Sequence, residues 1–544
     1  MQLLYTILIM LLVVGGTRLT SQFIPIPLPI IQIAVGALLA LPAFGLHVRL
    51  DPELFLLLFI PPLLFVDGWR MPKGQFWRLR TPILTLAFGL VLFTVLGAGW
   101  FIHLLIPSIP LPAAFALAAV LSPTDAVAVS AIVQGRLPRA LMHVLQGEAL
   151  MNDASGLVTF KFAVAAALTG VFSLGDASFS FLLVALGGLA MGMLLSAVVG
   201  RVRAWMIGRG WDDPATHVVF MLLLPFAAYV AAEHLGLSGI LSAVAAGMMQ
   251  SRVDLLPRQT ATRLLNYSVW AMLEYAFNGL IFLLLGLQLP DIVKAATALD
   301  EPSWLNVATL AGEVLAIFLV LMLLRFLWMY GYWRLSARVR DWRGRPRRFA
   351  GQSHMRLTVV LSLAGVRGAV TLAGVLSLPL LGGDGQPFPQ RDLLIFIAAG
   401  VILLSLLMAS VGLPLLLRGL PPDDEEWRER ERRMIWRKTA AAAIRALETQ
   451  TEDRSEDAET AALGAEVKAN IMAEYRKQLE TSDTGESQAR YRAAHALEQR
   501  LRLQALRAQR LELYRLRREH LIDDDVVRDI LRELDISEAM QQRG

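Results

Sequence analysis

The stretch Gly147-Glu148-Ala149-Leu150-Met151-Asn152-Asp153-Ala154-Ser155-Gly156 places a glutamate, an asparagine and an aspartate inside the apolar segment 141–170. An apolar segment of that length predicts a membrane-spanning helix. An ionised group at bilayer depth costs at least about 2.5 kcal/mol, and acids at such positions usually face a water-filled cavity or a partner charge. This stretch is therefore the strongest indication of function in the chain.

The composition indicates a polytopic, all-α membrane protein. The chain has 544 residues, 55% of them hydrophobic and only 18% charged, with a mean hydropathy of +0.53. Soluble domains carry about 25% charged residues. The absence of cysteine excludes disulfides and thiolate metal sites, and no cofactor is expected. The N-terminus lacks the basic region of a signal peptide, so we expect a retained first helix.

The apolar runs predict about 13 membrane spans. The boundary between the eighth and ninth spans is weak, because only the residues around 234–236 separate them. The approximate limits of all the predicted spans are 2–17, 25–46, 52–67, 82–105, 111–132, 141–170, 179–203, 215–234, 236–251, 266–289, 304–330, 356–381 and 391–418.

Basic residues alternate between the loops and predict the orientation. One set of alternate loops is rich in Lys and Arg, whereas the loops on the other side of the membrane hold few basic residues beyond Arg49, Lys294 and Arg391. Because loops rich in Lys and Arg face the cytoplasm, we expect the N-terminus outside, the C-terminal tail inside and an odd number of spans. The basic set comprises Arg18, Arg70, Lys73, Arg78, Arg80, Arg136, Arg139, Arg201, Arg203, Arg209, Arg252, Arg258, Arg263 and the segment 334–356.

The charge distribution divides the chain into a transmembrane domain, 1–420, and a cytoplasmic tail, 421–544. The tail holds 23 Lys and Arg against 27 Asp and Glu, a net charge of −4. Because the whole chain has a net charge of +5, residues 1–420 carry +9. The basic excess lies in short loops and fits anionic lipid head groups rather than nucleic acid. The tail begins at Pro421-Pro422, is rich in helix formers and is interrupted near 481–485.

The last part of the tail repeats leucines among arginines, at Leu497, Leu501, Leu506, Leu513 and Leu516. This pattern is typical of an amphipathic or coiled-coil-like helix. It suits a solvated helical bundle, or a domain that regulates the membrane part or supports a dimer.

Two further spans carry a charge at a predicted helix break. The fifth contains Ser122-Pro123-Thr124-Asp125, where proline removes an N–H and interrupts the helix. The twelfth contains Gly365-Val366-Arg367-Gly368. Each break alone is compatible with an ordinary kink, but seven spans separate them, which gives them opposite orientations. Paired interruptions of this kind indicate the binding site of a transporter built from an inverted repeat.

The sixth span fits as the neighbour that completes such a site. Glu148 and Asn152 are four residues apart and share a helix face, with Asp153 on the adjoining edge. A buried aspartate binds either a proton or a small hard cation, and competition between them gives exchange. Asn152 cannot titrate, so it orients Asp153 or supplies an oxygen. Glu148 needs a partner charge, and we expect a structural ion pair with Arg367.

Three motifs resemble the bacterial sodium/proton exchangers of the cation:proton antiporter superfamily, in the first, electroneutral branch that also contains the animal exchangers. They are Gly-Glu-x-x-x-Asn-Asp ending at Asp153, Ser-Pro-Thr-Asp-Ala-Val-Ala-Val at 122–129 and Gly-Val-Arg-Gly-Ala-Val-Thr-Leu-Ala at 365–373. The resemblance covers residues 1–420, and the tail is similar to that of a bacterial subgroup. It implies a multi-pass protein of the bacterial inner (plasma) membrane.

The resemblance also implies 13 helices, a homodimer and a core that moves like an elevator against a dimerisation part. Asp153 is then the shared carrier of cation and proton. Thr124, through its backbone carbonyl, and Asp125 border the site. The Asn152-Asp153 pair implies one cation per proton.

One position departs from the family pattern. Relatives often have a serine directly after the glutamate, where Ala149 stands here. Ser155 or a water is a candidate replacement. Asp67 resembles a position near the ion path, or caps a helix at the interface. Glu274 and Asn278 share a face of the tenth span, where they line a cytoplasmic funnel or join helices by hydrogen bonds.

The leading hypothesis is exchange of Na⁺, or of Li⁺ or K⁺, for H⁺ across the lipid bilayer. The alternatives are a K⁺/H⁺ antiporter and an ion-sensing membrane protein whose output is the tail. A channel is disfavoured because no filter-like repeat occurs. An enzyme is not expected, because the chain has no His-Glu-x-x-His, Gly-x-Ser-x-Gly or P-loop motif.

Overall fold

The protein is helical, without any strand, throughout the part that the structure, a computed structural model, describes. The predicted all-α fold is confirmed. Arg49, Arg258, part of the basic segment 334–356, the tail boundary at Pro421-Pro422 and the interruption at 481–484 lie outside the described residues. The described residues are 2–20, 23, 26–41, 52–169, 174–211, 213–253, 260–297, 304–342, 354–380, 388–418, 425–449, 458–480, 485–519, 526–527, 530–531, 533–535 and 537–538.

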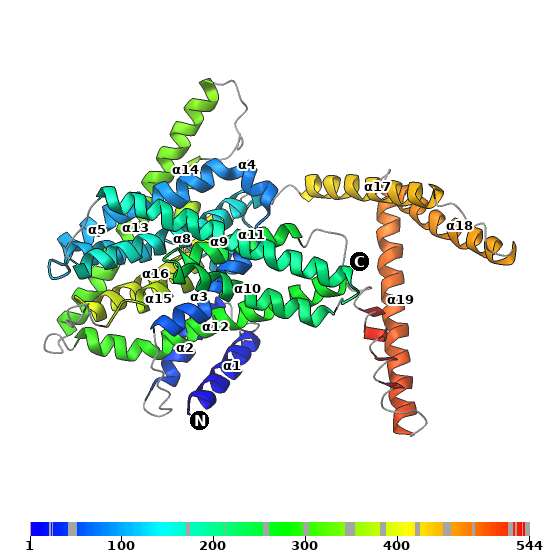
Figure 1. The fold of residues 1–544 in the computed structure, drawn as a ribbon, viewed down its shortest axis with the longest axis horizontal. Helices are drawn as coiled ribbons and strands as arrows, with labels where there is room; N and C mark the ends of the chain where they lie inside the picture. The colour runs from blue at the N-terminus through cyan, green and yellow to red at the C-terminus, as the bar shows by residue number, and fades with distance from the viewer. Residues whose placement is uncertain are drawn as a thin grey trace. The chain divides into compact units, whose positions relative to one another are not determined.

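The chain divides into two compact units, Met1–Asp423 and Asp424–Gly544. In the first unit α8 lies in the interior, surrounded by the other helices (Figure 1). Its helices are α1 (Gln2–Thr20), α2 (Leu28–Leu39), α3 (Pro52–Arg70), α4 (Lys73–Leu84), the π-helical η1 (Thr85–Leu90), α5 (Val91–Leu105), α6 (Leu111–Leu121), α7 (Ala126–Val133), α8 (Arg139–Thr169), α9 (Leu174–Gly208), α10 (Pro214–His234), α11 (Gly239–Val253), α12 (Thr260–Thr297), α13 (Trp304–Trp342), α14 (His354–Leu363), α15 (Ala369–Leu376) and α16 (Arg391–Leu417).

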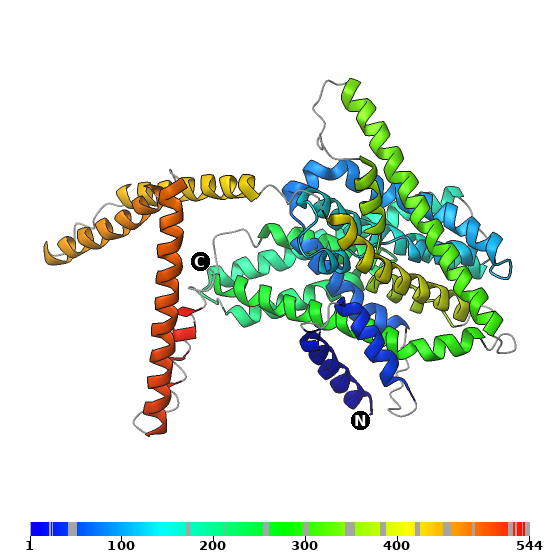
Figure 2. The same cartoon turned by 180° about the vertical axis from the view of Figure 1, so that it is seen from behind.

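Six helical stretches of the described residues are long and apolar enough to cross a membrane, and the bent pair α6–α7 adds a seventh. α13 is the longest helix of the unit at 39 residues, and Figure 2 shows it in light green, extending beyond its neighbours at one end. The protein is thus a membrane protein with several spans, and the count of 13 stays a prediction. The six stretches are Lys73–Leu105, Leu183–Gly208, Pro214–His234, Thr262–Pro290, Ala308–Ser336 and Arg391–Leu417.

Both predicted helix breaks are present. α6 ends at Leu121 and α7 starts at Ala126, with a bend of 43° between them. α14 ends at Leu363, and extended backbone leads to α15 at Ala369. Proline at 123 ends the first helix because it lacks an N–H, whereas the second break relies on the glycines on either side of Arg367.

Close glycine contacts fix two pairs of helices, α3 with α11 and α2 with α12. α3 and α11 approach until a Cβ on Gly247 would lie 2.1 Å from the carbonyl oxygen of Phe65. A Cβ on Gly286 of α12 would lie 2.1 Å from the carbonyl oxygen of Ile33 in α2. Neither backbone can retreat without disturbing a packed interface. These contacts hold α2, α3, α11 and α12 in fixed pairs.

We expect Gly247→Ala to destabilise the protein by about 1–3 kcal/mol, because the added methyl group overlaps backbone rather than a movable side chain. Gly331→Ala in α13 is the matched control, since a Cβ there meets nothing within 4 Å. Thermal unfolding in detergent measures both. An equal effect at the two positions would contradict the close packing of α3 and α11.

The second unit comprises α17 (Glu425–Thr449), α18 (Ala458–Glu480) and α19 (Gly485–Arg518). An ion pair of 3.7 Å between Glu448 and Arg476 joins α17 to α18. Of the predicted leucine repeat, Leu513 is buried, whereas Leu497 and Leu501 are more than half exposed. The tail is therefore helical, with part of its apolar repeat facing outward.

Candidate functional site

The two broken helices touch each other in the interior of the membrane unit. The backbone N–H of Asp125 donates to the carbonyl of Val366 over 2.7 Å. Gly368 lies so close that a Cβ there would be 1.9 Å from the Asp125 carboxylate. Only glycine fits at this contact. The two breaks therefore lie directly against each other, and this place is called the crossing below.

Asp125 caps the beginnings of both half-helices at this crossing. Its Oδ1 accepts hydrogen bonds from the N–H groups of Val127 and Ala128 at 2.8 and 2.9 Å. The N–H of Ala369, the first residue of α15, also hydrogen-bonds the carboxylate. A negative charge at two helix N-termini compensates their unpaired N–H groups and their dipoles.

Arg367 donates hydrogen bonds to carbonyl groups at the C-terminal ends of α6 and α14. Its Nε donates to the carbonyl of Leu121, the last residue of α6, over 3.1 Å, and its Nη1 donates to the carbonyl of Gly365. Both carbonyls lose their helical partners at a break. The guanidinium therefore replaces hydrogen bonds that the interrupted helices cannot make.

The ion pair of Glu148 differs from the prediction. Its partner is Arg325 of α13, not Arg367. Both oxygens of the fully buried Glu148 carboxylate accept from the two Nη atoms of Arg325, over 2.9 Å for the Nη2–Oε2 contact. Arg325 Nε donates to the Leu361 carbonyl over 2.9 Å, and its Cδ passes against Gly365. Arg367 uses Nε and Nη1 for carbonyl oxygens, whereas Arg325 uses only Nε for a carbonyl and keeps both Nη atoms for the glutamate.

Asn152 and Thr124 extend this network from the ion pair towards the break. Asn152 Nδ2 donates to Thr124 Oγ1 over 3.0 Å, and Thr124 Oγ1 donates to Glu148 Oε1 over 3.5 Å. Asn152 Oδ1 is buried and has no hydrogen-bond partner among the described residues. Asn152 thus fixes the Thr124 side chain rather than lining the open cavity.

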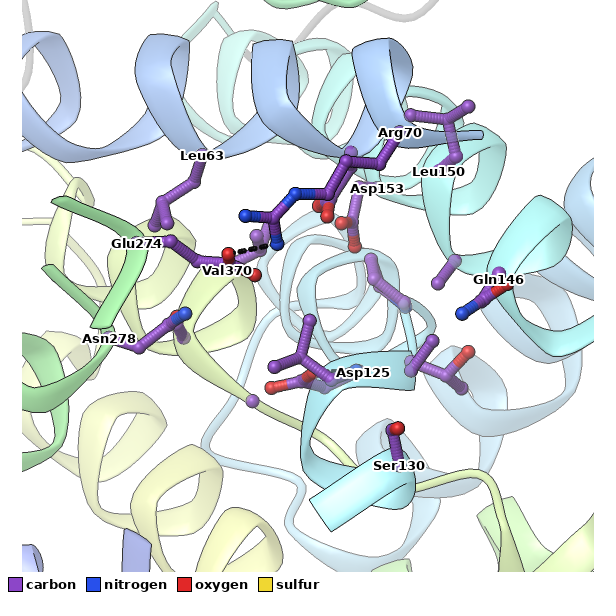
Figure 3. A pocket seen from close by; sticks show the side chains of 18 of the residues that line it. Leu63, Arg70, Asp125, Ser130, Gln146, Leu150, Asp153, Glu274, Asn278 and Val370 are labelled. Carbon is purple, nitrogen blue, oxygen red and sulfur yellow. Dashed lines mark hydrogen bonds and ion pairs between the residues drawn. The ribbon is translucent and has the colours of Figure 1, made fainter. Parts of the chain in front are cut away.

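Asp153 faces a cavity of about 440 Å³ beside the crossing. Asp67, Thr124, Asp125 and Ala149 also line it. Figure 3 shows Asp125 and Asp153 reaching towards the same space from different helices. Asp153 interacts electrostatically with both Asp67 and Asp125. The cavity therefore gathers three aspartates that lie 28 to 86 positions apart in the sequence.

Glu274 and Asn278 of α12 line the same cavity, but Ser155 does not. Glu274 also joins α12 to α3 through Arg70, which is the other of the two arrangements considered for this face. Ser155 Oγ donates to the carbonyl of Ala87 in η1 over 2.6 Å. A π-helical turn widens the backbone spacing and leaves such a carbonyl available. Ser155 thus joins α8 to η1 and does not replace the hydroxyl that Ala149 lacks.

Arg70 and Arg325 pair with acidic residues of the site, and neither pair was predicted from the sequence. Arg70 lines the cavity and pairs with Glu274, as the dashed line in Figure 3 shows. The sequence pattern places Arg70 in a basic loop, but Arg70 also follows Asp67 by three residues and therefore shares its helix face. For Arg325 the available signal was a single arginine in the middle of an apolar span.

The site offers oxygen donors to a small hard ion. Around Asp153 stand the carboxylates of Asp67 and Asp125 and the polar atoms of Thr124. Within the described residues, no group of three or more His, Cys, Asp or Glu side chains forms a metal cluster. Carboxylate and carbonyl oxygens suit hard cations, and a carboxylate also accepts a proton.

The transmembrane sodium/hydrogen exchanger family profile matches residues 7–419. The chain belongs to the sodium/hydrogen exchanger family. This exchanger is 46% identical, over 99% of each chain, to an uncharacterised Na⁺/H⁺ exchanger of Escherichia coli. It is 41% identical to a sodium, potassium, lithium and rubidium/H⁺ antiporter of Bacillus pumilus, over 96% of this chain and 76% of that protein.

Among solved structures, the sodium proton antiporter of Methanocaldococcus jannaschii resembles this exchanger with a TM-score of 0.59. The match covers 77% of this chain and 99% of that one at 17% identity, so it shows the fold alone. Family membership makes the protein a monovalent cation/proton antiporter and not an enzyme.

Proposed function

We propose that the exchanger moves one monovalent cation against one proton, with both ions competing for the Asp153 carboxylate. The observation that carries this proposal is the position of Asp153, on a cavity that the two broken helices and two further aspartates border. A single carboxylate that must be either protonated or cation-bound couples the two fluxes without a separate gate. Asn152, which carries no charge, keeps the count at one for one.

The ion would be held by oxygens from several elements. Asp153 supplies the carboxylate from α8, while Thr124, through its backbone carbonyl, and Asp125 border the site at the crossing. Because Asp125 already caps two half-helices, we assign it mainly to the site's electrostatics. The Glu148–Arg325 pair holds α8 against α13 and keeps this geometry fixed.

We infer that the cavity opens to the cytoplasm. In the predicted topology, Arg70 at the end of α3, Ser130 in α7 and Gln146 in α8 all lie on the cytoplasmic side of Asp153. On the other side of the crossing, α6 and α15 are buried along nearly their whole length. This inward-open arrangement would alternate with an outward-open one as the core moves like an elevator.

The remaining features implied by the resemblance belong to the same proposal. They are 13 spans, an inverted repeat, a homodimer and a location in the bacterial inner (plasma) membrane. The paired breaks of α6–α7 and α14–α15 support the inverted repeat. Na⁺ is the proposed substrate. Li⁺ and K⁺ are further candidates, because a Bacillus relative is named for several alkali cations and Ala149 presents a methyl group to the cavity where many relatives have a serine.

Transport in proteoliposomes tests this function. With an imposed pH gradient, Na⁺ is expected to dissipate the gradient at a rate that does not change when a membrane voltage is imposed with valinomycin and K⁺. A one-for-one exchange moves no net charge, so voltage does no work on it. Li⁺ and K⁺ replace Na⁺ in the same assay without valinomycin. Clear acceleration by voltage would overturn the one-for-one stoichiometry.

A further inference from the structure

The cavity is lined by more acidic than basic residues, and the proposed exchange at Asp153 assigns no role to the basic one. Among the described residues that line it, four are acidic, and Arg70 is the one basic residue. The acidic residues are Asp67, Asp125, Asp153 and Glu274.

Arg70 is held at one wall of the cavity by two groups of α12. Its guanidinium forms an ion pair with Glu274 and lies over the ring of Tyr267, 5.6 Å from the centroid. The Arg70 side chain is 33% exposed and that of Glu274 is 17% exposed, so the pair stands where the cavity meets solvent. The positive charge of Arg70 is therefore held in position at a partly hydrated edge of the cavity.

Arg70 is also electrostatically connected to the carrier. It interacts favourably with Asp67, one helical turn away on the same face of α3. Asp67 in turn interacts with Asp153. A change in the position or charge of Arg70 thus changes the potential that a cation meets at the aspartates.

We propose that Arg70 is a tethered positive charge that weakens cation binding at the aspartates, and that Glu274 restrains this effect by holding the guanidinium at the wall. The inference rests on the proposed exchange at Asp153. On this model Arg70 and Glu274 set the apparent affinity for the cation, although neither needs to touch the ion. The pair would set the cation concentration at which the exchanger works.

A purely structural pair predicts a different result. If Arg70 and Glu274 only clamp α3 to α12, removing either one breaks the same contact and has the same effect. If Arg70 acts through its charge, Arg70→Gln makes the cavity more negative and strengthens cation binding. Glu274→Gln frees the guanidinium to approach the aspartates and weakens it. The two models therefore differ in sign.

The test is the KM for Na⁺ in proteoliposomes at one alkaline pH, where protons compete little. We expect Arg70→Gln to lower the KM by about threefold to tenfold and Glu274→Gln to raise it by a similar factor, as for a unit charge acting across a partly hydrated cavity. The double variant should return close to the wild-type KM. Thermal unfolding of each variant accompanies the assay.

The ion pair between Lys161 and Glu233 provides the matched control. It joins α8 to α10 over 2.7 Å with comparable exposure, and neither residue lines the cavity. Lys161→Gln and Glu233→Gln should leave the KM for Na⁺ unchanged. Shifts of the same sign for Arg70→Gln and Glu274→Gln, or no shift in either, would overturn the inference. Absence of exchange by the wild-type protein would instead refute the proposed function.

Discussion

Asp153→Asn is expected to abolish all measurable exchange while leaving the protein folded. The amide has nearly the same shape as the carboxylate but neither takes up a proton nor neutralises a cation. Asp153 is buried and has two other aspartates in its electrostatic surroundings. The variant therefore loses the group for which both ions compete. Na⁺-induced dissipation of a pH gradient in proteoliposomes measures the loss.

Stability separates loss of transport from loss of fold in this variant. A buried carboxylate among like charges disfavours the folded state, so a neutral amide should keep the unfolding temperature or raise it. Lost exchange together with a lowered unfolding temperature would leave a folding defect as the cause. Retained exchange would move the carrier role to Asp67 or Asp125, the other aspartates of the cavity.

Local chemistry made the helix breaks predictable. Pro123 lacks an N–H wherever it stands, and glycines on both sides of Arg367 weaken a helix in any surroundings. These rules need only neighbouring residues. The meeting of the two breaks followed from an argument about orientation, and the contact between Asp125 and Val366 is consistent with it.

The partner of Glu148 was not predictable, because two arginines were available at membrane depth. The choice depends on how many guanidinium N–H groups the backbone carbonyls already take. Arg367 gives Nε and Nη1 to the carbonyls of Leu121 and Gly365, whereas Arg325 gives only Nε to a carbonyl and keeps both Nη atoms for the glutamate. The spacing of residues along α8 carries no information about which residue of α13 reaches Glu148.

The position of Arg70 in the site was not predictable for a related reason. The positive-inside rule alone accounts for a basic residue at the cytoplasmic end of a span. Its ion pair with Glu274 joins residues 204 positions apart, and only the packing of α3 and α12 brings them together. Ser155 was misplaced because the sequence does not reveal a π-helical turn in the neighbouring segment.

Glu148→Gln is expected to destabilise the protein by about 3–5 kcal/mol, because it leaves the buried guanidinium of Arg325 without its counter-charge. Both side chains are almost fully buried, so water cannot take the place of the lost partner. Thermal unfolding in detergent measures the effect. Combining Glu148→Gln with Arg325→Met should recover most of the loss, since an apolar side chain then replaces the unpaired charge.

The same double-mutant cycle distinguishes the two possible partners of Glu148. Glu148→Gln combined with Arg367→Met should be at least as unstable as the single variant, because Arg367 holds carbonyls at the breaks and not the glutamate. The coupling energy should therefore be large and favourable for Glu148 with Arg325 and smaller for Glu148 with Arg367. The reverse order would restore the pairing expected from the sequence. It would also mean that the crossing, rather than the contact between α8 and α13, depends on Glu148.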